Sequence, residues 1–113
     1  MWQIDSKNNI RLTRGDTPTF LLNLTTMSGE PYVPASGDEI MFVMKRSAED
    51  DEILAQISIP TDTLELRFSE YTTRDLEFGK YVYEISLNNS GEDYHDTFIA
   101  NTPIFITEEL YNG

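Results

Sequence analysis

The segment LEFGKYVYEISL, residues 76–87, carries the clearest secondary-structure signal in the chain. From Tyr81 to Leu87, aromatic or aliphatic side chains fall on every second residue, and mostly polar residues stand between them. Successive side chains of a β-strand point to opposite faces, so a period of two indicates a strand with one buried face. The segment therefore predicts a long strand that directs Tyr81, Tyr83 and Ile85 into a core.

The same alternation recurs along most of the chain, with Gly, Pro, Asn, Asp and Ser between the runs. Six further strands are expected, at residues 10–14, 20–25, 39–46, 53–59, 63–68 and 103–109. The run at 39–46 is apolar on both faces, since Met41 and Val43 stand between Ile40, Phe42 and Met44. A strand of this kind is typical of the middle of a sheet, with both of its faces covered.

Residues 69–78 break the alternation, and Ser69 followed by an acidic residue can cap a single helical turn. Several short strands with one brief helical crossing favour a β-sandwich over alternating strands and helices. We therefore predict an all-β fold of about seven antiparallel strands with one short helical turn. The chain is expected to form one domain over residues 1–113, with its core between about residues 10 and 107.

The entry into the strand at 80–88 suggests the kind of sandwich. Immunoglobulin-like sandwiches enter their sixth strand through a corner to which a tyrosine hydroxyl bonds back, and Tyr81 is the candidate here. The alternative is that Tyr81 and Tyr83 are inward-facing aromatics whose hydroxyls simply reach the rim of the core. Both interpretations place the two tyrosines in the core, and the fold that we expect is an immunoglobulin-like β-sandwich.

Composition excludes several classes of function. The chain has 113 residues with 20 acidic and 8 basic side chains, a formal net charge of −12, which repels nucleic-acid phosphates and anionic lipids. We therefore expect no nucleic-acid and no membrane partner. A hydrophobic content of 39% with 12% aromatic residues is typical of a folded domain rather than a disordered acidic tail.

Cysteine is absent, so disulfides, thiolate metal sites and a cysteine nucleophile are excluded. The first ten residues contain no signal-peptide core, and no segment approaches the roughly 20 apolar residues that span a bilayer. We expect synthesis as a soluble protein in a reducing cytoplasm.

The tripeptide Arg14-Gly15-Asp16 is one that cell-adhesion receptors read on exposed loops. It also lies between two predicted strands, where Gly permits a turn and Asp16 can bond nearby backbone. A second Gly-Asp pair, Gly37-Asp38, precedes another predicted strand and has no arginine before it. This recurrence favours turn formation over adhesion, since three-residue motifs arise readily by chance.

No catalytic, cofactor-binding or metal-binding residues are predicted. His95, the single histidine, is flanked by Asp93 and Asp96. Neighbours along a strand point to opposite faces, so His95 and Asp96 would not converge, and His95 with Asp93 is a pair without a third ligand or nucleophile. A solvent-exposed histidine is the simpler interpretation. The chain also lacks a Ser-His-Asp order, a Gly-rich phosphate loop and a His-x-x-x-His spacing, so we expect a protein that is not an enzyme.

Two further features leave alternatives open. The run Glu49–Glu52 places four carboxylates between two strands. These could bind calcium, form a solvated acidic loop or face a basic patch on a partner, although the glycine of a regular calcium loop is missing. Trp2 either anchors a contact with a partner or folds back over the end of the sandwich.

Four short patterns follow one another along the chain. They are Ile-x-Leu-x-x-Gly-Asp-Thr at residues 10–17, Gly-Glu-Pro-Tyr at 29–32, Gly-Asp-Glu-Ile-Met-Phe at 37–42 and Phe-Gly-Lys-Tyr-Val-Tyr-Glu-Ile at 78–85. In this order they resemble the immunoglobulin-like N-terminal domain of phage baseplate upper proteins and related small virion proteins. The resemblance covers residue 10 to about residue 107 and implies a sandwich that docks into a phage tail or neck without catalysis.

Baseplate upper proteins continue from this domain into a longer arm with receptor-binding parts, whereas the present sequence stops at Gly113. The resemblance therefore predicts assembly, and a receptor-binding role cannot be carried over to this chain. We expect a non-enzymatic phage or prophage virion structural protein of the tail, baseplate or neck, localised in the virion after synthesis in the bacterial cytoplasm. Its expected partners are other virion proteins or copies of itself in a symmetric assembly.

Two functions from other classes remain as alternatives. An extracellular carbohydrate-binding sandwich should expose a row of aromatics, and a hydrolase should pair carboxylates in a pocket. Here most aromatics stand in phase with the aliphatic core positions.

Overall fold

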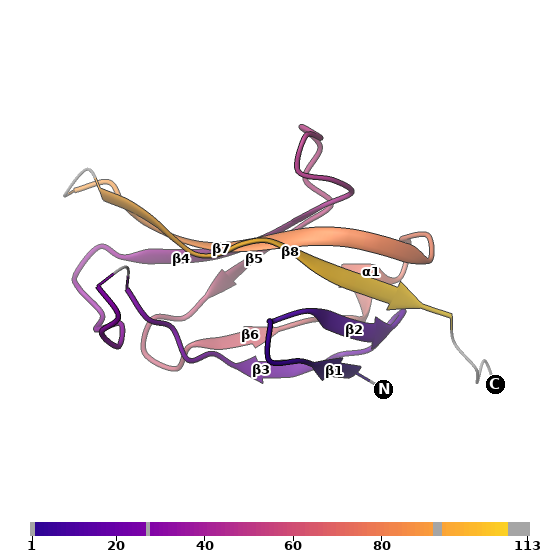
Figure 1. Ribbon diagram of the computed structural model, residues 1–113, viewed down its shortest axis with the longest axis horizontal. Helices are drawn as coiled ribbons and strands as arrows, with labels where there is room; N and C mark the ends of the chain where they lie inside the picture. The colour runs from indigo at the N-terminus through magenta and orange to yellow at the C-terminus, as the bar shows by residue number, and fades with distance from the viewer. Residues whose placement is uncertain (1, 27, 92–93, 109–113) are drawn as a thin grey trace.

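The computed structural model describes residues 2–26, 28–91 and 94–108, apart from the side chain of Trp2. This part of the chain is mostly β, with one short helix (Figure 1). The elements are β1 (Trp2–Ile4), β2 (Ile10–Thr13), β3 (Thr19–Leu21), β4 (Glu39–Lys45), β5 (Ala55–Ile59), β6 (Glu65–Arg67), α1 (Glu70–Thr73), β7 (Gly79–Asn89) and β8 (Tyr94–Thr107). The all-β expectation is confirmed.

The strands form two sheets. Six of them lie in the order β1-β2-β8-β7-β4-β5, and β3 pairs with β6 in a sheet of two. Strands β2 and β8 run parallel, with Ile10 opposite Ile104, while the other described pairs are antiparallel. The expectation of wholly antiparallel strands is therefore wrong for this pair. A parallel pair requires a long connection, and here the whole domain lies between the first and last strands of the core.

The described chain has eight strands where about seven were expected. Strand β1, with three residues, folds back antiparallel onto β2 at the edge of the large sheet and was not predicted, because so short a run shows no periodicity. Strand β8 begins nine residues before the predicted run at 103–109 and pairs with β7 as a long hairpin. Strand β4 lies between β7 and β5, as expected for an inner strand, but Met41 on its outer face is only half-buried.

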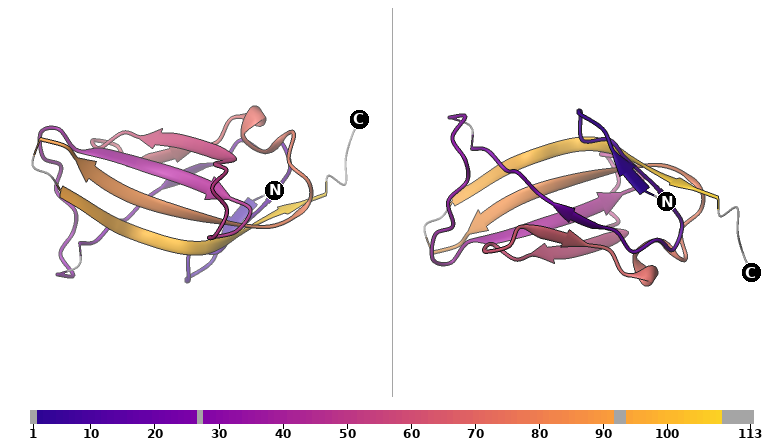
Figure 2. Two further views of the ribbon diagram at one scale, coloured as in Figure 1. Left: turned by 90° about the horizontal axis from the view of Figure 1, so that it is seen from above. Right: turned by 90° about the horizontal axis from the view of Figure 1, so that it is seen from below.

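The small sheet lies against one face of the large sheet, which curls so that β1 and β2 lie near the level of β3 (Figures 1 and 2). The core fills the space between these layers. Its buried residues are Ile10, Leu12, Phe20, Leu24, Ile40, Phe42, Met44, Ile59, Leu66, Phe68, Tyr81, Tyr83, Ile85, Leu87, Ile104 and Ile106. The alternation of Tyr81, Tyr83 and Ile85 thus gave the correct face of β7. Leu22 continues the alternation of Phe20 in the strand expected at residues 20–25, and this pattern predicts that it is buried. It is only partly buried, and β3 ends one residue before it.

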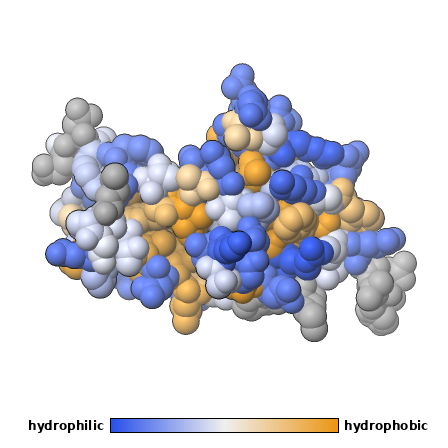
Figure 3. Space-filling model, viewed as in Figure 1, coloured by the Kyte–Doolittle hydropathy of each residue, from blue (hydrophilic) through white to orange (hydrophobic). Residues whose placement is uncertain are grey.

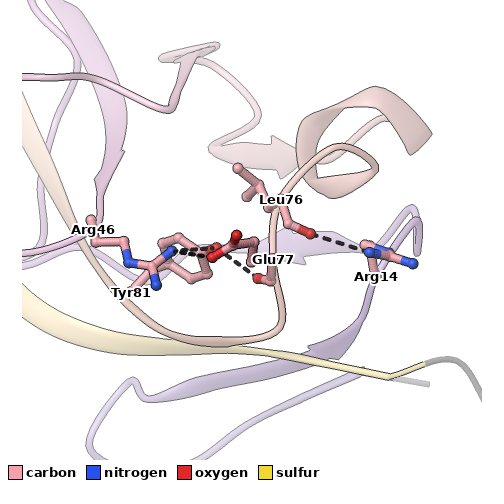
Figure 4. A network of polar contacts seen from close by, with 5 residues as sticks. All are labelled: Arg14, Arg46, Leu76, Glu77 and Tyr81. Carbon is pink, nitrogen blue, oxygen red and sulfur yellow. Dashed lines mark hydrogen bonds and ion pairs between the residues drawn. The ribbon is translucent and has the colours of Figure 1, made fainter.

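The corner between α1 and β7 is closed by a tyrosine. The Tyr81 hydroxyl donates to the Glu77 carbonyl at 2.6 Å, and the Arg46 guanidinium lies 5.3 Å from the centre of the Tyr81 ring (Figure 4). The proposed role of Tyr81 at this corner is confirmed. Ser69 caps α1 as predicted, since its hydroxyl accepts from the Tyr71 N–H at 3.2 Å.

Candidate functional site

The Arg14-Gly15-Asp16 tripeptide forms a turn between β2 and β3. The Asp16 N–H donates to the Thr13 carbonyl at 3.0 Å, and the Asp16 carboxylate accepts from the Thr13 N–H at 3.2 Å. Gly15 has a φ of +87°, a conformation that L-residues with side chains rarely adopt. The predicted turn is therefore confirmed, and the backbone bond of Asp16 reaches back to Thr13.

The arginine of this tripeptide lies against the fold. Its guanidinium donates to the Leu76 carbonyl at 3.4 Å (Figure 4). The same guanidinium lies 4.3 Å from the centre of the Phe78 ring. The Gly15 N–H donates to the Thr73 hydroxyl at 2.8 Å, which ties the turn to α1. A receptor would have to break these contacts to read the arginine, so the geometry favours a structural turn over an adhesion ligand.

The second Gly-Asp pair repeats this turn. The Asp38 N–H donates to the Ala35 carbonyl at 3.1 Å, and the Asp38 carboxylate accepts from the Ala35 N–H at 3.0 Å. Gly37 has a φ of +89°. Both pairs thus combine a glycine of positive φ with an aspartate that bonds three residues back, and the second turn forms without a preceding arginine.

Substituting Asp16 by Glu is expected to lower the free energy of unfolding by about 0.5–1.5 kcal/mol, the usual value of one hydrogen bond. The longer side chain places its carboxylate beyond the Thr13 N–H and loses rotamer freedom if it bends back. Denaturant titration measures this loss. Attachment of integrin-bearing cells, if any occurs, should be the same for both proteins; attachment lost in the variant at unchanged stability would contradict the turn interpretation.

A groove of about 480 Å³, here called the apolar groove, opens between the two layers. Its lining residues come from the β1–β2 hairpin, from β3 and the run after it, and from the core: Ile4, Asp5, Asn8, Ile10, Thr19, Phe20, Leu21, Leu22, Asn23, Leu24, Leu66, Tyr83, Ile85 and Ile99. Figure 3 shows apolar side chains reaching the surface between the layers on this face. Leu21 is 77% exposed and Ile4 39%, so apolar surface continues beyond the groove itself.

One wall of the apolar groove is the second edge of β3. Strand β6 is the strand that pairs with β3 in the described part of the chain, with Phe20 opposite Leu66. The Leu22 N–H donates to the Leu64 carbonyl of that neighbouring segment at 3.0 Å. Backbone groups of an antiparallel strand alternate between its two edges, so those of Thr19 and Leu21 point away from β6 and toward the groove.

The opposite wall is the β1–β2 hairpin, which is held in place by its own hydrogen bonds. The Asp5 carboxylate accepts from the Lys7 N–H and the Asn9 N–H, each at 2.9 Å. The Asn9 amide bonds the same carboxylate and is the main reason that the pKa of Asp5 is lowered. The Tyr83 hydroxyl, on the floor of the groove, donates to the Asn8 carbonyl. The groove is thus bounded by a hairpin anchored to the core.

Burial of the Tyr83 phenol, together with the charge of Asp5, raises the pKa of its hydroxyl. The hydroxyl therefore stays protonated and can keep donating to Asn8 throughout the physiological pH range.

A second groove of about 510 Å³, here called the tyrosine groove, lies at the end of the β7–β8 hairpin. It is lined by Thr26, Glu30, Pro31, Tyr32, Val33, Ala35, Asp38, Leu87, Asn89 and Tyr94. The Tyr32 hydroxyl donates to Asp38 at 2.6 Å, and the buried Asn89 amide donates to the same carboxylate at 2.9 Å. Tyr94 is 47% exposed, so part of its ring is open to a ligand.

The electrostatics of the tyrosine groove follow from these contacts. The hydrogen bond from Tyr32 lowers the pKa of the Asp38 carboxyl, and bonds from Asn89 and the Ala35 N–H act in the same direction against partial burial. Burial and the Asp38 carboxylate raise the pKa of the Tyr32 phenol. Asp38 is therefore an ionised acceptor, and its partners give it a structural role in the turn.

The other predicted candidates do not form a site within the described residues. His95 is exposed, as expected, and lies 3.0 Å from the Asn88 side-chain oxygen, while Asp96 is buried on the opposite face. Asp93 and the side chain of Trp2 lie outside the described part of the chain. The loop with Glu49–Glu52 is exposed and projects from the layers (Figure 1). In the described ranges no three His, Cys, Asp or Glu side chains are grouped to hold a metal ion.

Comparison with protein-family models gives no match for this sequence, and comparison with curated protein sequences gives none either. Within residues 2–26, 28–91 and 94–108, no helix is long and apolar enough to cross a membrane.

Proposed function

We propose that this protein is a non-enzymatic structural component of a phage or prophage virion, of the tail, baseplate or neck, that works through assembly contacts. The observation that carries the proposal is the apolar groove beside the second edge of β3, with Leu21 77% exposed at its border. An apolar patch next to a free strand edge is a liability for an isolated protein and a docking surface for an assembled one. The resemblance of the four sequence patterns adds the phage context.

We also infer that the domain is an immunoglobulin-like β-sandwich. Three features support this classification: a two-stranded sheet lies against a larger one, β2 pairs in parallel with the last strand, and the Tyr81 hydroxyl closes the corner before β7. Domains of this class act through the surfaces that they present rather than through a common catalytic site.

Mass spectrometry of purified particles from cells that produce this chain tests the assembly function. Peptides of the chain should remain in a constant ratio to a tail protein through successive gradient steps, because an assembled subunit repeats under the symmetry of the particle. A soluble host protein of similar abundance serves as the control for carry-over. Loss of the chain's peptides together with that control would contradict a virion role.

A second function is favoured by the tyrosine groove. Tyr32 and the half-exposed Tyr94 could stack on sugar rings beside the polar groups of Asp38 and Asn89, as in an extracellular carbohydrate-binding module. A glycan array with the pure chain tests this function. The carbohydrate function would be favoured over the assembly function by two results together. The chain would bind a specific glycan that Tyr94→Ala does not bind, and purified particles would not contain the chain.

A further inference from the structure

We propose that the apolar groove receives one extended strand of a basic partner protein, which adds to the second edge of β3. The proposal deepens the assembly function and rests on it, because it names the surface and the chemistry of the partner. Strand addition of this kind obtains affinity from backbone hydrogen bonds and selectivity from alternate side chains.

The backbone groups for such a pairing are already aligned. Thr19 and Leu21 line the groove and direct their N–H and C=O groups toward it, at the spacing of two residues that a neighbouring strand requires. Strand β3 covers roughly 10 Å at the usual rise per residue, enough for a short added strand. Neither Thr19 nor Leu21 needs these groups for its pairing with β6, so strand addition leaves the two-stranded sheet intact.

The side chains of the groove specify an apolar face on the added strand. Its floor is formed by Leu66, Ile85 and Ile99 together with the ring of Tyr83, all from the core side of the layers. Every second side chain of an added strand would point toward this floor. Burial of Leu21 and Ile4, now 77% and 39% exposed, would provide a further hydrophobic contribution.

Charge identifies the occupant as a basic partner rather than a second copy. Among the described residues that line the groove, Asp5 is the charged one, and none is a lysine or arginine. The whole chain carries −12, so a second copy would bring the same excess of negative charge to the contact. A strand with Lys or Arg beside its apolar residues is attracted by this field, and its association slows as salt rises.

Calorimetry of the pure chain with defined peptides tests the proposal. The probe is a peptide of about eight residues, an ordinary strand length, that alternates Val and Thr and carries Lys at both ends. It should bind at one site. A matched peptide with Glu at both ends should bind at least about tenfold more weakly because of repulsion. A Lys-ended peptide with every backbone amide N-methylated should not bind, since neither of its edges can donate to β3.

Two matched variants locate the site. Leu21 and Val33 are both 77% exposed, but Leu21 borders the apolar groove and Val33 the tyrosine groove. Leu21→Lys should weaken binding of the Lys-ended peptide at least about tenfold through lost apolar contact and added repulsion, whereas Val33→Lys, with the same change in charge, should not. Circular dichroism verifies that both variants fold; if Leu21→Lys does not fold, Leu21→Gln replaces it.

Several outcomes would overturn the strand-addition proposal: no saturable binding of the Lys-ended peptide, equal binding of its N-methylated form, or equal weakening by Leu21→Lys and Val33→Lys. Because these measurements use only the pure chain, they are independent of the particle analysis. If the chain is present in particles but its apolar groove binds no peptide, the assembly function stands and the strand-addition proposal is rejected. If the chain binds the peptide but is absent from particles, the strand-addition proposal stands and the virion role is rejected.

Discussion

Substituting Phe42 by Ala is expected to lower the free energy of unfolding by about 3–5 kcal/mol, the usual cost of emptying a buried aromatic site. Phe42 is fully buried on β4. Its ring centre lies 5.3 Å from that of Tyr83 on β7 and 5.3 Å from that of Phe68, next to the small sheet. The ring thus contacts both layers, and no single neighbour can move to fill the cavity without losing its own contacts.

Denaturant titration of the wild type and of Phe42→Ala gives the difference directly. The control is Phe78→Ala, which removes the same side chain from a site that is 43% exposed, together with its contact to Arg14, and should lose only about 1–2 kcal/mol. A loss below about 1 kcal/mol for Phe42→Ala would mean that β4 does not present this face to the core.

The faces of the long strands could be predicted because one of their sides is buried. In β7 a shift of the pairing register by one residue would move Tyr81, Tyr83 and Ile85 from the core to the other face of the sheet. Because one face must be buried, apolar residues have to recur at every second position of the strand. The end of a strand is less constrained: Leu22 continues the alternation of Phe20, yet β3 stops before it. The side-chain pattern therefore predicts which face of a strand is buried, whereas the length of the strand depends on which neighbour is available for pairing.

The parallel pairing of β2 with β8 could not be predicted from either strand. Alternation in Ile10 and Leu12 specifies a half-buried strand but not the direction of its neighbour. That direction follows from the path of the whole chain between the first and last strands of the core. The three residues of β1 were missed for a different reason, since they are too few to show a period.

The apolar groove also could not be predicted from the sequence, because its walls come from segments that are far apart in the chain. One local signal was present. Phe20, Leu21 and Leu22 are consecutive apolar residues, and a strand cannot direct all three to the same face. The outward position of Leu21 could therefore have been inferred, and an exposed leucine on a short strand indicates a contact surface when it lies beside other apolar groups.

Substituting Asp38 by Ala is expected to lower the free energy of unfolding by about 2–3 kcal/mol, because hydrogen bonds to a charged group are stronger than neutral ones. The variant removes the acceptor used by the Tyr32 hydroxyl at 2.6 Å, by the Ala35 N–H at 3.0 Å and by the Asn89 amide at 2.9 Å. Asn89 is only 3% exposed, so the loss of its carboxylate partner is not readily replaced by water. The turn before β4 and the β7–β8 hairpin would loosen together.

The pH dependence of this difference identifies its source. The bonds from Tyr32, Asn89 and Ala35 lower the pKa of Asp38 in the folded state below its value in the unfolded chain. The ionised carboxylate therefore contributes stability that is fully present above the unfolded pKa, about 3.9, and is lost as pH falls through the lower folded value. Denaturant titrations measure the difference in free energy of unfolding between wild type and Asp38→Ala. This difference should be constant from neutral pH down to about pH 4 and should become smaller below that.

The control is Asp51→Ala, an equal change of charge at an exposed residue, which should change the free energy of unfolding by no more than about 0.5 kcal/mol. A gap that instead widened in acid would mean that the neutral carboxyl, and not the carboxylate, holds Tyr32 and Asn89 in place.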